Sequence, residues 1–182
     1  MNNEKNKKKV VILGVGNVLL KDEGVGVRVV QRIQDRYDLP PGVEAVDGGT
    51  LGLKLLAVID QADRLLVVDA VKNGGKPGDV YRFSFEEIPY AIRQKNSLHQ
   101  TDLMEALTVV ELIGTRPETV IVGVEPADIS PWGVELTPPV AASLDRLEAM
   151  ALEELKKWSI ELRPRELTDT PTDEPLEWTP RA

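Results

Sequence analysis

Residues 10–28, VVILGVGNVLLKDEGVGVR, constrain the fold most, because they join an apolar strand, a glycine turn and the start of a helix. The run at 10–15 is rich in β-branched residues, which is typical of a strand buried on both faces. Gly14 and Gly16 then allow a tight turn. Asp22 and Glu23 therefore lie in the loop that leaves the carboxyl end of a strand, where open α/β sheets bind their ligands.

Two nucleotide-binding interpretations of this segment fail. A dinucleotide fingerprint requires a third glycine three positions after Gly16, where this chain has Leu19. A phosphate loop requires Gly-Lys-Ser/Thr, which is absent, and the two carboxylates would repel phosphate. Asp22 and Glu23 are therefore either acids that favour the positive end of a helix or ligands, and this segment alone leaves both readings open.

Apolar runs alternate with helical patterns along the chain, which predicts a layered α/β domain. The segment at 79–84, DVYRFS, alternates in polarity and is expected at a sheet edge, running antiparallel. Thr137 is expected to cap the last helix, with Pro138 in its first position. The predicted strands are 10–15, 43–47, 64–69, 79–84 and 119–124, and the predicted helices are 24–37, 51–59, 101–113 and 138–158.

Composition divides the chain into a polar N-terminal extension at 1–9, a single domain at 10–158 and a tail at 159–182. The tail carries prolines at 164, 171, 175 and 180 among acidic and threonine residues, so we expect it to be disordered. Trp178 is the residue of this tail that can dock on a surface. No apolar run approaches the ~20 residues that a membrane span needs, so membrane insertion is not expected.

Charge and cysteine content exclude several function classes. The chain has no cysteine, which rules out disulfides, thiol catalysis and thiolate metal sites and suits a cytoplasmic protein. The net charge is −8; residues 1–9 contribute +3 and residues 159–182 contribute −3, so the domain itself also carries −8. An acidic domain argues against nucleic-acid binding.

Polar groups follow three predicted strands, at the points where each strand ends. They are Asp22-Glu23, Asp47-Gly48-Gly49-Thr50 and Asp69, and the single histidine, His99, precedes a predicted helix. Taken singly, Asp69 reads as a turn cap and His99 as a surface residue. Together, one imidazole and two carboxylates at one sheet edge form a nitrogen and oxygen ligand set that suits nickel or zinc.

Other hydrolase chemistries fail on the residues available. There is no G-x-S-x-G elbow, and a single histidine cannot form H-E-x-x-H. A Ser-His-Asp triad has only His99 to use, and no serine lies in an elbow-like turn. Metal-linked chemistry is the class that remains.

The chain resembles a known family, the hydrogenase maturation proteases. These are endopeptidases that process the large subunit of nickel-iron hydrogenases. The resemblance covers roughly residues 10–155 and keeps the family's order and spacing. Its motifs are GVGNVLLKDEGVGVR (14–28), VDGGTLGLKLL (46–56), LLVVDAV (65–71), SLHQTDL (97–103), VGVEP (122–126) and GVELTPPV (133–140).

The resemblance implies a three-layer α/β/α domain with a mixed, mostly parallel five-stranded sheet, similar to the phosphorylase/hydrolase-like fold. It also implies that Glu23, Asp69 and His99 bind the metal. Family members often carry two aspartates where this chain has Asp22-Glu23. The implied substrate is a large-subunit precursor with nickel already bound, from which a C-terminal peptide is cut. The nickel arrives with the substrate, and zinc or cadmium is expected to substitute in vitro.

The cleavage step is left open between two schemes. Either the shared metal polarises the carbonyl or activates water, or it positions the substrate while Asp47 or one of the ligand carboxylates acts as general base. Gly48 and Gly49 would let an extended substrate approach the backbone, with Thr50 donating a hydrogen bond; a turn with a helix cap is an equal reading. Trp132 is read as loop packing in preference to a platform for the partner's tail.

Two other functions compete with the maturation protease. One is a peptidase or amidase of the same fold that acts on small peptides with its own tightly bound metal. The other is a nickel-sensing chaperone that binds the precursor without cutting it. A processing assay on purified proteins separates them.

Overall fold

The computed structural model describes residues 8–49, 54–87, 98–130 and 132–165. A five-stranded sheet lies at its centre, with the strand order β3-β1-β4-β6-β5. The first four strands are parallel, and β5 runs antiparallel to β6 at the edge, as its alternating sequence predicted. The strands are β1 (Val10–Gly14), β3 (Val43–Asp47), β4 (Arg64–Ala70), β5 (Val80–Ser84) and β6 (Glu118–Val124).

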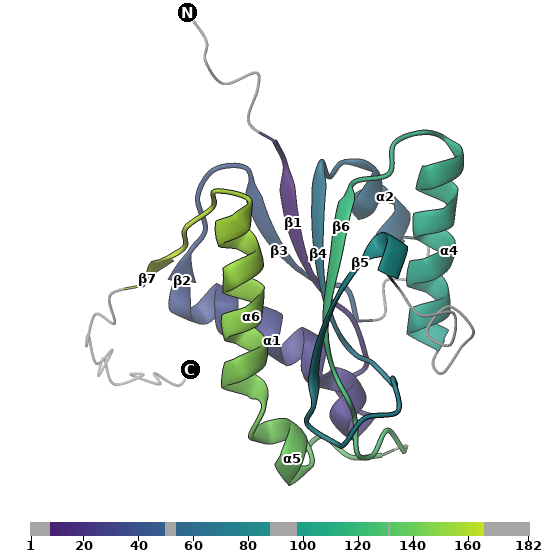
Figure 1. Cartoon of the computed structure of the whole chain (residues 1–182), viewed down its shortest axis with the longest axis vertical. Coiled ribbons are helices and arrows are strands. Elements are labelled where there is room, and N and C mark those ends of the chain that lie inside the picture. Colours follow the sequence, from purple (N-terminus) through teal and green to yellow (C-terminus); the bar gives the residue numbers. More distant parts are fainter. Residues whose placement is uncertain (1–7, 50–53, 88–97, 131, 166–182) are drawn as a thin grey trace, which may run out of the picture.

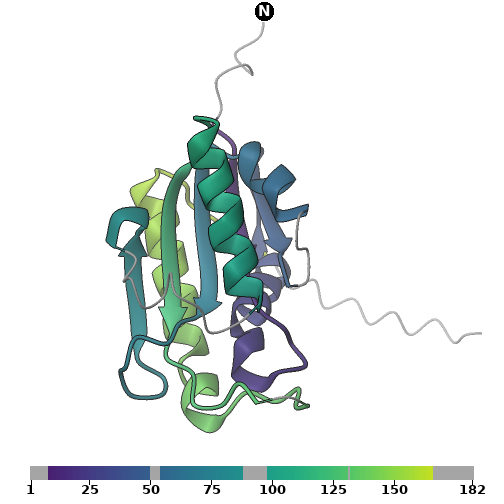
Figure 2. The same ribbon diagram turned by 90° about the vertical axis from the view of Figure 1, so that its right-hand side faces the viewer.

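Helices cover both faces of this sheet, so the predicted three-layer α/β/α architecture is confirmed (Figures 1 and 2). Successive side chains of β1 point to opposite faces. Val10 and Ile12 therefore pack with α1 (Val25–Arg36) and α6 (Leu144–Lys157). Val11 and Leu13 pack with α2 (Lys54–Asp60) and α4 (Leu98–Leu112).

The predicted helix at 138–158 is instead two helices, α5 (Pro138–Ala141) and α6. Ser143 lies between them, and its hydroxyl donates to the carbonyl of Gly78 at 2.8 Å, which ties this junction to the loop before β5. Thr137 occupies the N-cap position of α5 but makes no side-chain cap hydrogen bond. The predicted N-cap position of Thr137 and the predicted first position of Pro138 are therefore confirmed, although the Thr137 hydroxyl does not bond to the end of the helix.

Two further boundaries differ from the sequence prediction. Helix α4 begins at Leu98, so His99 lies within its first turn and not in the loop before it.

The chain also stays packed beyond residue 158. Leu162 is buried, and β7 (Arg163–Pro164) pairs with β2 (Tyr37–Asp38) in a short antiparallel ladder. The domain therefore extends past the predicted boundary. Trp178 and the rest of 166–182 lie outside the described residues.

The parallel strands end together at the lower end of the molecule in Figure 1. In the register of the sheet, Gly14 of β1 pairs with Asp47 of β3 on one side and with Val68 of β4 on the other. Asp69 is the next residue of β4 and pairs with Gly123 of β6. The acids predicted to follow three strands therefore lie at the end of the sheet formed by the carboxyl ends of its parallel strands.

Candidate functional site

Four carboxylates are buried at the carboxyl end of the sheet, each at most 7% exposed. Asp22 and Glu23 belong to η1 (Lys21–Gly24), the short 3-10 turn between β1 and α1. The other two are Asp69, within β4, and Glu125, directly after β6. A buried carboxylate is costly unless hydrogen bonds or a cation balance it, so the partners of each acid show what it does.

Asp22 is fully satisfied by hydrogen bonds from a distant loop. Its Oδ2 accepts from the backbone N–H groups of Ala127 at 2.9 Å and Asp128 at 3.0 Å. Both oxygens accept from Thr137, Oδ1 from its backbone N–H at 2.7 Å and Oδ2 from its hydroxyl at 2.8 Å. Asp22 therefore anchors the 126–137 loop to η1 and is not a helix cap.

Glu23 has the opposite environment. Its Oε2 is buried and has no hydrogen-bond partner among the described residues. Gly24 is the N-cap of α1, so Glu23 does not cap that helix either. The backbone holds Glu23 in place from below: Gly16 has φ +122°, and a Cβ added there would lie 1.7 Å from the Glu23 carbonyl oxygen. Only glycine fits this position, so the close approach of Gly16 fixes the backbone of Glu23.

Asp69 belongs to β4, and η1 packs against this strand. The backbone N–H of Val15 donates to the carbonyl of Val68 at 2.9 Å, which fixes the β1–η1 connection to the end of β4. Asp69 Oδ1 accepts from the N–H of Ala70 at 2.7 Å. Asp69 sits inside the strand, so the turn-cap reading does not apply to it.

His99 approaches the same end of the sheet through topology. The end of α4 leads into the start of β6, so the first turn of α4 lies toward the carboxyl ends of the strands. The side chain of His99 is outside the described part of the structure. Among the side chains that are described, no three His, Cys, Asp or Glu residues gather closely enough to hold a metal. A ligand set completed by His99 stays a prediction.

Asp47 and the glycines after it form a closed turn. Asp47 is exposed, and its Oδ1 accepts from the N–H of Gly49 at 2.9 Å. Cβ atoms added at Gly48 and Gly49 would meet Leu13 Cδ1 at 2.6 Å and the Gly16 carbonyl at 3.0 Å. The two glycines therefore pack closely against β1 and the β1–η1 connection, and a larger residue would require these neighbours to shift. Thr50 lies outside the described residues, so its substrate and cap readings both stand as predictions.

Glu125 is a member of this acidic end that the sequence reading did not single out. Its Oε2 accepts from the N–H groups of Asn73 at 2.8 Å and Gly75 at 3.1 Å and from the Tyr81 hydroxyl at 2.9 Å. Burial of the phenol and this hydrogen bond raise the pKa of Tyr81 to about 12. A glutamate ending a strongly apolar strand was the signal for it, as for Asp69.

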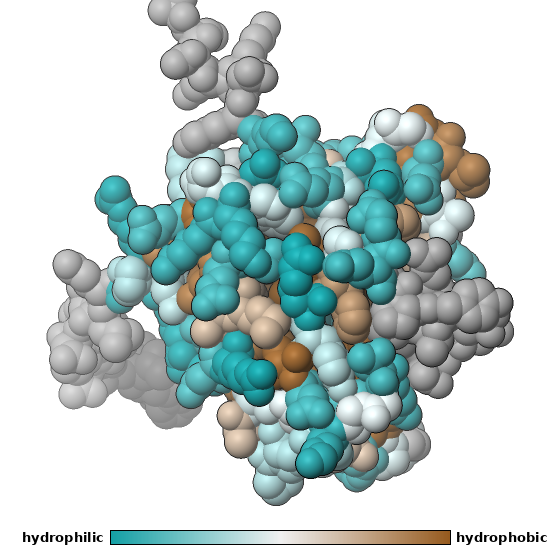
Figure 3. Space-filling model, in the orientation of Figure 1, coloured by the Kyte–Doolittle hydropathy of each residue, from teal (hydrophilic) through white to brown (hydrophobic). Residues whose placement is uncertain are grey.

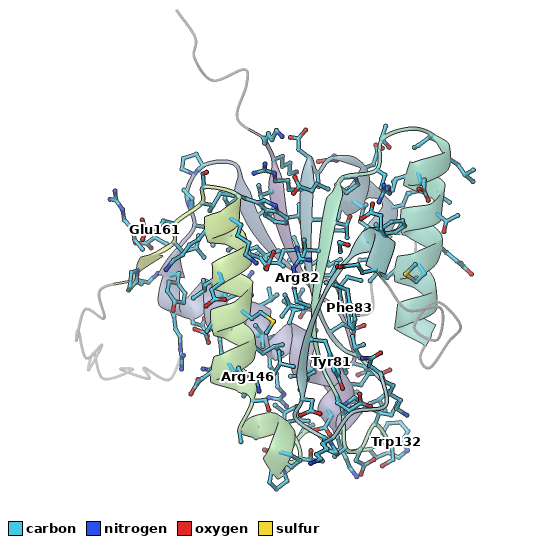
Figure 4. The ribbon with its side chains drawn as sticks, viewed as in Figure 1. Tyr81, Arg82, Phe83, Trp132, Arg146 and Glu161 are labelled. Carbon is cyan, nitrogen blue, oxygen red and sulfur yellow. The ribbon has the colours of Figure 1, made fainter. Side chains whose placement is uncertain are left out.

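Trp132 lies in the loop that Asp22 anchors, at the rim of the lower end (Figure 4). Its side chain is 85% exposed, so the loop-packing interpretation is wrong.

None of the helices in the described part of the chain has the length and apolar character of a membrane span.

The chain is similar in sequence and in structure to proteins that act in hydrogenase maturation. A family model described as hydrogenase maturation protease matches residues 27–154. The chain is 38% identical to the hydrogenase expression/formation protein HupD of Bradyrhizobium diazoefficiens, over 84% of this chain and 80% of that one. It is also 38% identical to the hydrogenase 2 maturation protease of Escherichia coli, over 87% and 97%. The solved structure of the E. coli hydrogenase maturating endopeptidase HybD superposes with a TM-score of 0.81 and 36% identity, covering 86% of this chain and 98% of that one.

Proposed function

Because the chain belongs to the hydrogenase maturation protease family, we propose that it cuts a C-terminal peptide from the large-subunit precursor of a nickel-iron hydrogenase by recognising the nickel bound there. In this proposal Glu23, Asp69 and His99 contact the ion, and the precursor supplies the remaining ligands. Zinc or cadmium in the precursor would take the place of nickel in vitro.

The observation that carries the proposal is the buried Oε2 of Glu23, which has no hydrogen-bond partner in the part of the chain that the structure describes. A carboxylate oxygen in this state destabilises the folded protein, and a cation beside it removes the cost. Asp69 lies on the strand that η1 packs against, which offers a second oxygen ligand nearby. The first turn of α4 brings the backbone of His99 toward the same end.

Oxygen and imidazole ligands suit a protein that must recognise nickel bound to its substrate without removing the ion. This chain has no cysteine, so it offers nickel no thiolate. A set of two carboxylates and one imidazole binds nickel less tightly than a thiolate cage does and can share the ion in a complex. A precursor without nickel would lack this bridge, and insertion of the metal would thereby be checked before cleavage.

For the hydrolysis itself we propose Asp47 as the general base. It is exposed at the end of β3, and its turn is held by the hydrogen bond from Gly49. A general base must reach the attacking water while the substrate is held in place. Nickel, when bound, would add the charge stabilisation of a Lewis acid at the same edge.

The Glu23→Gln variant tests the metal-reading proposal. The substitution keeps the shape of the side chain and removes the charge that balances the cation. With nickel-loaded precursor, we expect kcat/KM for peptide release to fall by more than about tenfold, about 1.4 kcal/mol of lost transition-state stabilisation. Release is followed by mass spectrometry.

Glu153→Gln is the matched control, because Glu153 is exposed on α6 and the same charge is removed far from the site. It should process the precursor at the wild-type rate. Wild-type activity in Glu23→Gln would contradict the assignment of Glu23 as a ligand.

A further inference from the structure

An exposed apolar surface lies beside the candidate metal site. It consists of Leu19, Trp132 and Val134, which are 49%, 85% and 51% exposed, and is called here the Trp132 surface. Leu19 comes from the connection between β1 and η1, and the other two come from the 126–137 loop. Figure 2 shows these two segments running side by side at the lower end of the molecule.

Backbone hydrogen bonds join the two segments into one unit. The N–H of Lys21 donates to the carbonyl of Gly133 at 2.7 Å, and the N–H of Gly133 donates to the carbonyl of Leu19 at 3.0 Å. The aliphatic stem of Lys21 lies against Gly133, and its ammonium pairs with Asp128 and contacts Ser130 Oγ at 3.1 Å. The Trp132 surface is therefore held in one arrangement without help from the tryptophan ring.

The backbone beneath the ring is strained. Trp132 has φ +69°, a left-handed conformation that a bulky side chain disfavours, and Lys21 has φ +52°. In the described part of the chain, these are two of the three non-glycine residues with positive φ. Strain of this kind gathers at functional sites, because folding alone would favour glycine there. The ring is exposed and gains little packing from its own protein, so it is free to contact a partner.

The position of this surface identifies the occupant. Lys21 is followed at once by Asp22 and Glu23, and Asp22 accepts hydrogen bonds from Ala127 and Asp128 of the loop that carries Trp132. The Trp132 surface is thus continuous with the edge at which the precursor would present its metal. We propose that it binds an apolar segment of the large-subunit precursor next to the metal-holding segment, as a second contact that does not use nickel. This inference rests on the proposed function.

Trp132→Gly separates binding from folding. Glycine accepts the left-handed backbone, so the melting temperature of the free protein should stay the same or rise. The Kd for purified precursor, measured by calorimetry, should increase about tenfold, which is the effect expected for loss of an exposed aromatic anchor. The increase should occur with nickel-loaded and with metal-free precursor alike, and Trp132→Phe should restore most of the affinity.

Leu112→Ala is the matched control. Leu112 is 81% exposed in the apolar patch at the end of α4, at the opposite end of the molecule (Figure 3), and its loss should leave the Kd unchanged. A wild-type Kd in Trp132→Gly, an equal loss in Leu112→Ala, or a lost affinity accompanied by a lower melting temperature would overturn the proposal. Binding without cleavage by the wild-type protein would contradict the proposed protease activity and leave this docking surface standing.

Discussion

Asp22 and Glu23 are neighbouring carboxylates with different tasks. Four donors surround the oxygens of Asp22, so its buried charge is stabilised by the protein's own dipoles. Glu23 Oε2 receives no hydrogen bond within the described residues, so its charge is left for an outside partner to balance. One acid therefore holds the site together, and the other is the carboxylate proposed to contact the ion.

The Asp22→Asn variant should be less stable than the wild-type protein. The amide NH2 would replace one carboxylate oxygen and face either the N–H of Thr137 or the N–H groups of Ala127 and Asp128, which leaves buried donors without an acceptor. We expect the free energy of unfolding in urea to fall by about 2–4 kcal/mol. Asp35→Asn, an exposed change on α1, should cost nothing measurable. Equal urea midpoints for the two variants would contradict the anchoring role.

The sequence predicted where these acids lie but not how they divide the work. An apolar run followed by glycines is a local signal, and it correctly places Asp22 and Glu23 after a strand. The donors to Asp22 come from residues 105 to 115 positions away, which no local pattern reveals. The same holds for Trp132, whose exposure depends on how two distant loops pair.

At the scale of elements, hydrophobic periodicity was a reliable guide. All five strands form where alternating or continuous apolar runs predicted them, and β5 is the antiparallel edge strand. The break between α5 and α6 was missed, because apolar residues continue through it in helical spacing. At the break the Ser143 hydroxyl donates to the carbonyl of Gly78, a contact between distant segments that no local pattern predicts. The two-residue strands β2 and β7 are too short to leave a pattern in the sequence.

The end of the domain gives a test at this scale. A chain ending after Trp158 would lose Leu162, which is buried in the core, and the ladder between β2 and β7. We expect it to be less stable by about 2–4 kcal/mol, since burying one leucine contributes about 1.5–3 kcal/mol. A chain ending after Arg165 should keep the wild-type melting temperature. If both truncations melt alike, residues 159–165 do not belong to the folded domain.

At the scale of the whole molecule, the parallel sheet is what assembles the site. It brings the carboxyl ends of β1, β3 and β4 side by side, so that acids separated along the chain lie at the same end of the sheet. The N-terminal turn of α4 approaches this edge from one face, and the loop anchored by Asp22 borders it. The fold therefore places the proposed ligands Glu23 and Asp69, the proposed base Asp47 and the Trp132 surface toward the same end of the molecule.

The central claim is that the protein reads nickel in its substrate. The most direct test incubates the purified wild-type protein with equal amounts of nickel-loaded and metal-free large-subunit precursor and measures the rate of C-terminal peptide release. The account predicts that the loaded precursor is cut at least about tenfold faster, a difference of about 1.4 kcal/mol or more in the barrier. Equal cleavage of both precursors would contradict recognition of the bound nickel. It would favour an acid–base peptidase whose activity does not depend on the metal.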